Sequence, residues 1–233
     1  ESKSGVSQTM TMHLQRDLED LKKKLLDMGS LVEKATNLAI SALQERRADL
    51  CSEVHELDVT IDRREVVIEE DCLKILALHQ PVATDLRFVV CVMKVNNDLE
   101  RMGDLAINIA ERAAYLATHD DIGVPLDFHR MLEVVRTMVK QSLNSLINLD
   151  VMTAREVLAM DDEVDDINKQ MFVILEALMV ENPAVITRAI HMLSASRHLE
   201  RIADLATNIA EDVAFLVEGA VIRHQPEDYT KDS

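Results

Sequence analysis

The chain has 233 residues, of which 48% are hydrophobic, yet it contains only two Tyr, four Phe and no Trp. Its core must therefore consist of aliphatic residues and Met, while five Gly and four Pro leave too few breakers for a β-sandwich, a barrel or a Rossmann loop. This composition predicts an all-α protein. The formal net charge of −17 argues against the basic surface that recognition of a phosphate backbone needs, so we expect no nucleic acid partner.

Two further observations bear on where the protein acts. No uncharged apolar run approaches the roughly 18 residues that a membrane span requires, so we expect no direct membrane insertion. The three cysteines, Cys51, Cys72 and Cys91, are odd in number and lack CxxC spacing. They are typical of reduced thiols rather than of a disulfide framework, and the sequence therefore predicts a cytoplasmic protein.

Apolar periodicity and helix breakers predict six helices. Apolar residues recur at alternating spacings of four and three from Leu14 to Ala42, which is the pattern of a helix-bundle seam. Pro81 ends the second helix, and Thr84 or Asp85 is positioned to cap the third. The predicted helices cover residues 10–47, 50–78, 83–117, 127–149, 153–180 and 184–218.

An internal repeat divides the chain. The segment from Leu99 to Glu111 returns as the segment from Leu199 to Glu211, with ten of thirteen positions identical at an offset of 100. Each copy closes a group of three predicted helices, so the economical architecture is two three-helix units. The sequence predicts these units over residues 9–118 and 126–218, followed by a polar tail over residues 219–233.

Acidic residues form a stripe on the third predicted helix that points away from its apolar face. If the second and third helices form an antiparallel hairpin, Asp58 lies level with Asp104. The predicted clusters are Asp58, Asp62, Glu100 and Asp104 in the first half, and Asp161, Asp165, Glu200 and Asp204 in the second. Four carboxylates this close repel one another unless a cation, protons or a basic partner neutralises them. The alternative is an ordinary solvated helix face.

The chemistry available at these clusters is that of oxygen ligands, to which Asn108 and Asn208 add neutral amides. Oxygen donors suit hard cations, and clustered carboxylates suit more than one ion, but the metal itself stays open. No Glu is followed by His three residues later, which argues against a ferritin-like di-iron site. No nucleophile motif stands out, so we expect that the protein is not an enzyme. The alternative is a metal-dependent phosphohydrolase.

The repeated motif Leu-Glu-Arg-x-x-Asp-Leu-Ala-x-Asn-Ile-Ala-Glu, together with Gln-Pro-Val-Ala-Thr-Asp-Leu-Arg over residues 80–87, resembles the PhoU family over nearly the whole chain. The resemblance implies two tandem three-helix bundles related by pseudo-twofold symmetry. It also implies multinuclear metal clusters on the bundle surface, with iron foremost and zinc, manganese or magnesium as alternatives.

The implied metal ligands can be assigned position by position. They are Asp58, Asp62, Glu100, Asp104 and Asn108, and Asp161, Asp165, Glu200, Asp204 and Asn208, with Glu111 and Glu211 as outer members. Asn168 stands where the first half has Glu65, and Phe172 stands where it has Glu69. We therefore expect the second cluster to bind fewer ions or to bind them more weakly.

The resemblance also implies a function. PhoU proteins are cytoplasmic negative regulators of phosphate uptake and of the phosphate-starvation response. They act as adaptors between the ATPase of the phosphate ABC transporter and a phosphate-sensing histidine kinase, without catalytic activity, and are often homodimers. A PhoU-like accessory protein of another phosphate permease is the neighbouring alternative.

Overall fold

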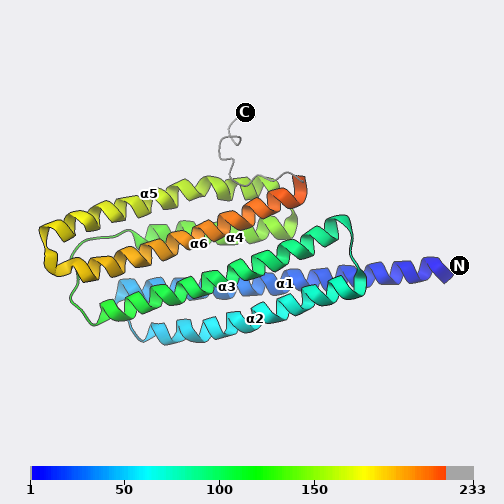
Figure 1. Cartoon of the computed structure of the whole chain (residues 1–233), viewed down its shortest axis with the longest axis horizontal. Coiled ribbons are helices and arrows are strands. Elements are labelled where there is room, and N and C mark those ends of the chain that lie inside the picture. The colour runs from blue at the N-terminus through cyan, green and yellow to red at the C-terminus, as the bar shows by residue number, and fades with distance from the viewer. Residues whose placement is uncertain (1, 219–233) are drawn as a thin grey trace, which may run out of the picture.

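The computed structural model describes the backbone of residues 2–218 and the side chains of residues 12–218. Within this range six α-helices follow one another, and a single 3-10 turn, η1, precedes the last of them (Figure 1). Their bounds are α1 Ser2–Glu45, α2 Leu50–His79, α3 Ala83–Ala117, α4 Phe128–Asn148, α5 Val151–Glu181, η1 Pro183–Val185 and α6 Ile186–Glu218. The predicted all-α architecture of two three-helix bundles is confirmed, whereas the tail predicted over residues 219–233 lies outside the described residues.

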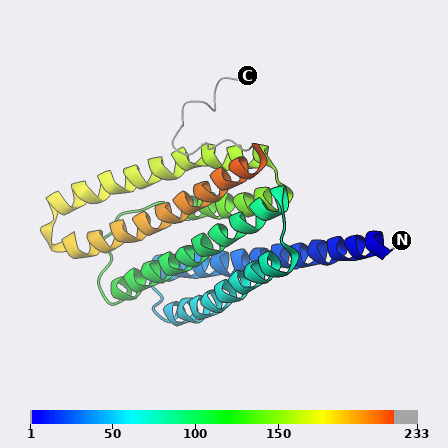
Figure 2. The same ribbon diagram turned by 45° about the vertical axis from the view of Figure 1, so that its right-hand side comes forward.

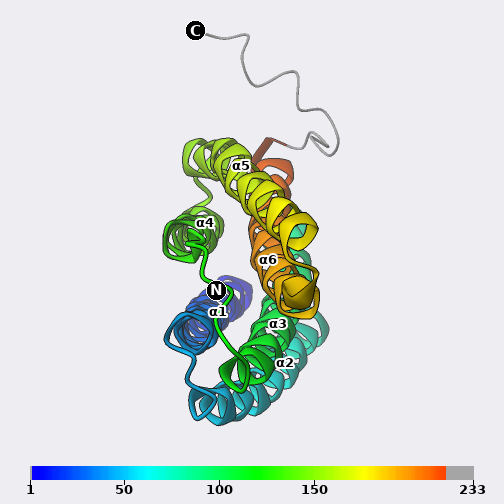
Figure 3. The ribbon, with the colours of Figure 1, turned by 90° about the vertical axis from the view of Figure 1, so that its left-hand side faces the viewer.

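The helices form two layers when the molecule is viewed along their axes (Figure 3). One layer holds α2, α3, α6 and α5 in that spatial order, and the other holds α1 and α4. The two halves meet where α3 packs against α6 and where α1 packs against α4. Figure 2 shows that the N-terminal part of α1 projects beyond the ends of α2 and α3.

One hydrophobic core runs through both halves. It extends from Leu18 on α1 to Leu216 on α6 and includes buried side chains from all six α-helices. Gly29 shows how tightly the halves meet, because a Cβ atom at this position would lie 2.2 Å from Leu143 Cδ1 on α4. A side chain at position 29 would therefore force the end of the Leu143 side chain to move.

Side-chain caps decide where two of the helices begin. Asp150 accepts hydrogen bonds from the backbone N–H groups of Met152 and Thr153, so α5 begins at Val151, two residues before its predicted start. Asp127 accepts a bond from the backbone N–H of Arg130 and caps α4. The capping role predicted for Thr84 or Asp85 was wrong, because α3 already begins at Ala83 with no side-chain cap.

The remaining differences from the sequence-based expectations are small. Helix α1 starts at Ser2, eight residues before its predicted start, because a helix without apolar periodicity leaves no signal in the sequence. The three cysteines are free and buried, as expected. Over residues 2–218, no helix combines the length and apolar character that crossing a bilayer demands.

Candidate metal centres

The first acidic cluster lies on the outer side of the α2–α3 hairpin. Buried Ile61 anchors α2 to the core, so that Asp58 and Asp62, three residues before it and one after it, lie at the edge of the buried face. On α3 the buried residues Leu99 and Met102 face inward, which leaves Glu100 and Asp104 on the outer side of the helix. All four carboxylates are thus placed by the same periodicity that builds the core.

Electrostatic coupling shows that these four side chains are neighbours. Burial raises the pKa of Asp58, and the charges of Asp62 and Asp104 raise it further. Burial likewise raises the pKa of Glu100, followed by the effects of Asp104 and Asp62. The predicted alignment of the α2–α3 hairpin is therefore present in the structure. Glu65, one turn further along α2, joins the cluster, since burial, Glu69 and Asp62 raise its pKa.

The Asp58 carboxylate is the innermost member of the first cluster. Its Oδ1 atom is buried and has no hydrogen-bond partner among the described residues. The absence of a side chain at Gly103 makes room for it, because a Cβ there would lie 3.3 Å from Asp58 Oδ1 and 3.2 Å from Ile61 Cδ1. A buried carboxylate oxygen without a donor is unfavourable by itself and is the kind of atom that a cation would satisfy.

The second cluster repeats the arrangement on α5 and α6. Burial raises the pKa of Asp161 to about 6, with the charges of Asp204 and Asp165 adding to the effect. The pKa of Glu200 is raised by burial and then by Asp204, Asp165 and Asp161. Desolvation and the charge of Asp165 also raise the pKa of Asp204. The second hairpin therefore brings together the four carboxylates that correspond to those of the first cluster.

The two clusters differ one turn away from their centres. In the second half, the hydroxyl of buried Ser196 donates a hydrogen bond of 2.5 Å to Oδ1 of Asn168. At the equivalent place in the first half, the Asn96 amide donates to the backbone oxygen of Glu65 over 2.9 Å, which leaves the Glu65 carboxylate unengaged by this bond. The Asn168 side chain is thus held in a neutral hydrogen bond where the first half offers a carboxylate.

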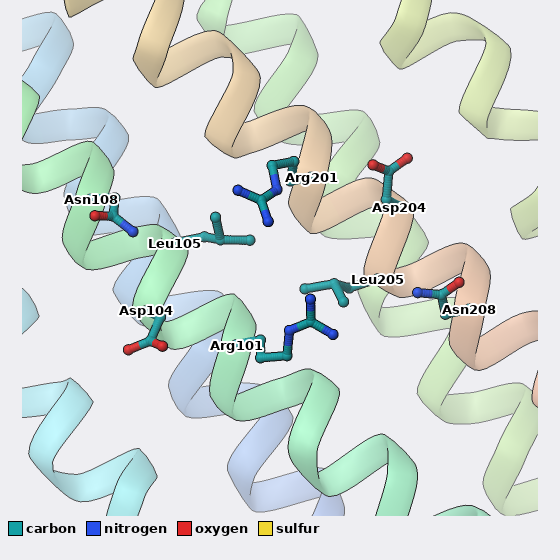
Figure 4. Close-up of a pocket in the computed structure, with 8 residues that line it drawn as sticks. All are labelled: Arg101, Asp104, Leu105, Asn108, Arg201, Asp204, Leu205 and Asn208. Carbon is teal, nitrogen blue, oxygen red and sulfur yellow. The ribbon is translucent and has the colours of Figure 1, made fainter.

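A polar groove of about 340 Å³ separates the two clusters at the contact between α3 and α6 (Figure 4). Symmetry-related pairs line it: Arg101 with Arg201, Asp104 with Asp204, Leu105 with Leu205, and Asn108 with Asn208. The predicted ligands Asn108 and Asn208 therefore lie in this groove, each one turn beyond an aspartate of a cluster. The sequence analysis missed the two arginines, although their repetition at an offset of 100 was the signal that could have found them.

The outer members that the sequence suggested lie further along the same helices. Glu111 forms a salt bridge with Arg112, with Oε2 at 3.4 Å from Nη2, and Glu211 is half-buried on α6. Over residues 12–218, no three His, Cys, Asp or Glu side chains stand as a preformed metal-ligand set. The donor chemistry nevertheless fits hard cations, because each helix pair brings four carboxylates together. One of these carboxylate oxygens, Asp58 Oδ1, is also buried without a hydrogen-bond partner.

Comparison with known proteins assigns the chain to a family. The family model described as the PhoU domain matches twice, over residues 25–113 and 128–213. The chain belongs to the PhoU family. It is 41% identical over 214 residues to the phosphate-specific transport system accessory protein PhoU homolog of Aquifex aeolicus, covering 92% of this chain and 97% of that protein. The homolog of the same name from Pseudomonas aeruginosa is 36% identical over 226 residues, covering 96% and 93% of the two chains.

Solved structures of PhoU proteins share the fold. The crystal structure of PhoU from Pseudomonas aeruginosa superposes with a TM-score of 0.84 at 38% identity, covering 88% of this chain and 99% of that chain. The phosphate transport system regulatory protein PhoU from Streptococcus pneumoniae superposes with a TM-score of 0.83 at 27% identity, covering 89% and 98%. These similarities extend over most of the chain and show that the fold is shared.

Proposed function

We propose that this protein is a cytoplasmic negative regulator of phosphate uptake that acts as an adaptor between the phosphate ABC transporter ATPase and its sensor histidine kinase. The observation that carries the proposal is the match of the PhoU family model to both halves of the chain. The alignments cover 97% and 93% of two relatives that are named accessory proteins of the phosphate-specific transport system. These relatives are named as accessory or regulatory proteins rather than as enzymes. An adaptor is accordingly favoured over a phosphohydrolase.

The proposal includes cation binding at the two acidic clusters. Asp58, Asp62, Glu100 and Asp104 would hold ions on the α2–α3 pair, and the equivalent four residues would hold them on α5–α6. Iron, zinc, manganese and magnesium are all candidates. A bound multivalent cation supplies charge neutralisation, which removes the mutual repulsion that adds to the effect of burial on the carboxylate pKa values. Each cluster would then join its two helices through shared ligands, and Asp58 Oδ1 would gain the partner that it lacks.

The surface that contains these clusters is suited to recognition by a partner protein. Helices α2, α3, α6 and α5 lie side by side in one layer, and both clusters and the groove between them lie on this layer. Cation loading changes the charge of that surface without any change of fold, so that a partner could distinguish the loaded from the unloaded state. We include a homodimer in the proposal, which size-exclusion chromatography with light scattering would test.

The adaptor function is tested by capture from phosphate-replete cells. We expect affinity-tagged protein to recover both the transporter ATPase and the kinase. The matched control is the variant that changes Asp58, Asp62, Glu100 and Asp104 to Asn or Gln, which tests whether capture depends on the first cluster. Recovery of a different phosphate permease would favour the neighbouring accessory function, and turnover of phosphoesters by metal-loaded protein would favour the enzyme.

A reporter of the starvation response tests regulation directly. Deletion of the protein should leave the response switched on at high phosphate, and Glu100→Gln should restore at least part of the repression because each cluster holds four acids. Complete loss of repression by folded Glu100→Gln protein at normal abundance would show that this single carboxylate is indispensable.

A further inference from the structure

The groove between α3 and α6 is lined by two positively charged side chains, one from each helix. Figure 4 shows the guanidinium groups of Arg101 and Arg201 extending into the gap from opposite helices. In the same view, the carboxylates of Asp104 and Asp204 point away from the gap. Like charges that share one groove repel unless an anion lies between them, and this arrangement occurs in a chain whose formal net charge is −17.

Neither arginine is neutralised by a strong ion pair. The Nη1 atom of Arg101 lies 3.8 Å from Asp98 Oδ1 on its own helix, at the outer limit of a salt bridge, and the Arg101 side chain is 52% exposed. Arg201 acts electrostatically on Asp204, whose pKa its charge lowers against the larger effects of burial and Asp165, but the structure shows no salt bridge of 4 Å or less between Arg201 and another residue in the range 12–218. Both guanidinium groups therefore keep donors available to a ligand in the groove.

The other lining residues add to a binding site for an anion with several oxygens. Leu105 and Leu205 are 6% and 5% exposed and form an apolar floor, which lowers the local dielectric and strengthens charge-assisted hydrogen bonds. Asn108 and Asn208 bring amide groups that can donate from both sides. The groove volume of about 340 Å³ admits a tetrahedral oxyanion together with water.

We propose that Arg101 and Arg201 bind a phosphoryl oxyanion across the pseudo-twofold axis, one guanidinium group from each half of the chain. Planar guanidinium groups pair with phosphate oxygens through two parallel hydrogen bonds, which a lysine cannot reproduce. The oxyanion class follows from the geometry, whereas the choice of inorganic phosphate as the biological ligand rests on the proposed function. A phosphoryl group of a larger molecule has the same chemistry.

The site is coupled to the acidic clusters on either side. Asp104 and Asp204 belong both to the lining of the groove and to the two clusters. Without cations their charges oppose those of the arginines. Cations on the clusters would neutralise them and leave the groove positive, so that oxyanion affinity should increase on cation loading. This coupling rests on the cation sites of the proposed function, while the arginine pair does not.

Isothermal titration of the full chain with inorganic phosphate, and separately with pyrophosphate, tests the site. We expect binding of at least one of the two, tighter with Mg²⁺ present, and the comparison of the two shows which source of the phosphoryl group is preferred. A blank titration corrects for the direct association of Mg²⁺ with phosphate. The variant Arg101→Gln/Arg201→Gln should bind at least tenfold more weakly, because two charge-assisted contacts are lost. Arg101→Lys/Arg201→Lys should recover only part of the affinity.

The control variant is Lys34→Gln, which removes one positive charge at an exposed position of α1 and does not line the groove. It should leave binding within about twofold of the parent chain. Absence of binding by both anions would overturn the proposal, as would binding that the double Gln variant retains, since the anion would then lie on the cations. An oxyanion affinity that Mg²⁺ leaves unchanged would refute the coupling to the acidic clusters but not the arginine site. The cation content of the same samples shows whether the metal sites are filled, so that an empty metal site is distinguished from an arginine site that does not bind.

Discussion

The two acidic clusters belong to two copies of the same repeat, and they differ in the residues that lie beneath the carboxylates. In the first half a Cβ at Gly103 would lie 3.2 Å from Ile61 Cδ1. The repeat places Ala203 and Val164 at the corresponding positions of the second half, and Val is smaller than Ile by one methylene group. Volume removed on one helix is thus returned on the other. The comparison teaches that a smaller residue on one helix of each pair is accompanied by a larger residue on the other helix.

The clusters differ also in their negative charge. Glu65 and Glu69 extend the first cluster along α2, whereas Asn168 and Phe172 occupy these places on α5. Phe172 is 43% exposed despite its aromatic ring. The first cluster therefore offers more oxygen donors, and the second cluster offers fewer donors beside an apolar surface. The following experiments break or sharpen this comparison.

The largest effect is expected from removing the first cluster. Changing Asp58, Asp62, Glu100 and Asp104 to Asn or Gln should empty one cation site and leave the other filled, since the clusters lie on different helix pairs. Elemental analysis of protein loaded with Mn²⁺ and desalted would measure this. The control with the same change in charge alters four exposed carboxylates outside the clusters, Glu53, Glu56, Glu70 and Glu176. Equal metal contents in all three proteins would refute the assignment.

A smaller effect should follow from exchanging the flanking residues. Asn168→Glu combined with Phe172→Glu gives the second cluster the donors of the first, and we expect its cation affinity to rise about tenfold, equivalent to about 1.4 kcal/mol. The reciprocal pair Glu65→Asn and Glu69→Phe should weaken the first cluster by a similar factor. Competition with a metal-sensitive dye measures both changes. If neither pair shifts the affinity, the four central carboxylates alone determine binding.

Asp161 provides a test of what it costs to ionise a cluster carboxylate in cation-free protein, since burial raises its pKa first and the neighbouring carboxylates raise it further. Its pKa of about 6 lies above the ordinary 3.8, so the folded chain binds more protons than the unfolded chain between about pH 4 and pH 6. The free energy of unfolding should therefore fall as the pH rises through this window. Asp161→Asn should stabilise the protein in chelator by roughly 1–2 kcal/mol at pH 7.5, with a difference near zero at pH 4.

Urea unfolding at a series of pH values measures this difference. The matched control is Glu176→Gln, which changes an exposed carboxylate further along α5 and should leave the pH profile close to that of the parent chain. A constant difference between Asp161→Asn and the parent across the whole pH range would show that the gain does not come from ionisation.

The smallest effect concerns the packing beneath the carboxylates. Gly103→Ala gains helix propensity of up to about 1 kcal/mol, but the new methyl group crowds Ile61 Cδ1 at 3.2 Å. Combining it with Ile61→Val reproduces the residue pair of the second half. We expect a coupling free energy of about 0.5–1 kcal/mol in favour of the double variant in a double-mutant cycle. Additive changes would show that Ile61 moves aside without strain.

The sequence predicted most of the fold because its signals were periodic. The seam from Leu14 to Ala42, Pro81 and the offset of 100 together gave six helices and two units without any structure. The periodicity did not predict the helix ends as closely. The start of α5 depends on hydrogen bonds of the Asp150 side chain, about which the spacing of apolar residues carries no information. The start of α1 lies in a segment whose residues repeat no apolar pattern.

The candidate site was predictable to the level of its carboxylates. Counting residues from the turn at Pro81 aligned Asp58 with Asp104, because helix rise is constant. The groove lined by Arg101 and Arg201 could not be obtained in this way. It depends on the contact between α3 and α6, which joins two halves whose relative placement no count along one hairpin determines.

The continuous core has a consequence for exchange of amide hydrogens with solvent. Since the main hydrophobic core includes buried side chains from all six α-helices, opening either half requires disruption of packing that the other half shares. An ion bound at the first centre at a hundredfold excess over its dissociation constant adds about 2.7 kcal/mol to the stability of this shared core. Deuterium uptake at the most protected amides should then slow about a hundredfold in α6 as well as in α3. The exchange rate in one half would therefore report whether the cation site of the other half is filled.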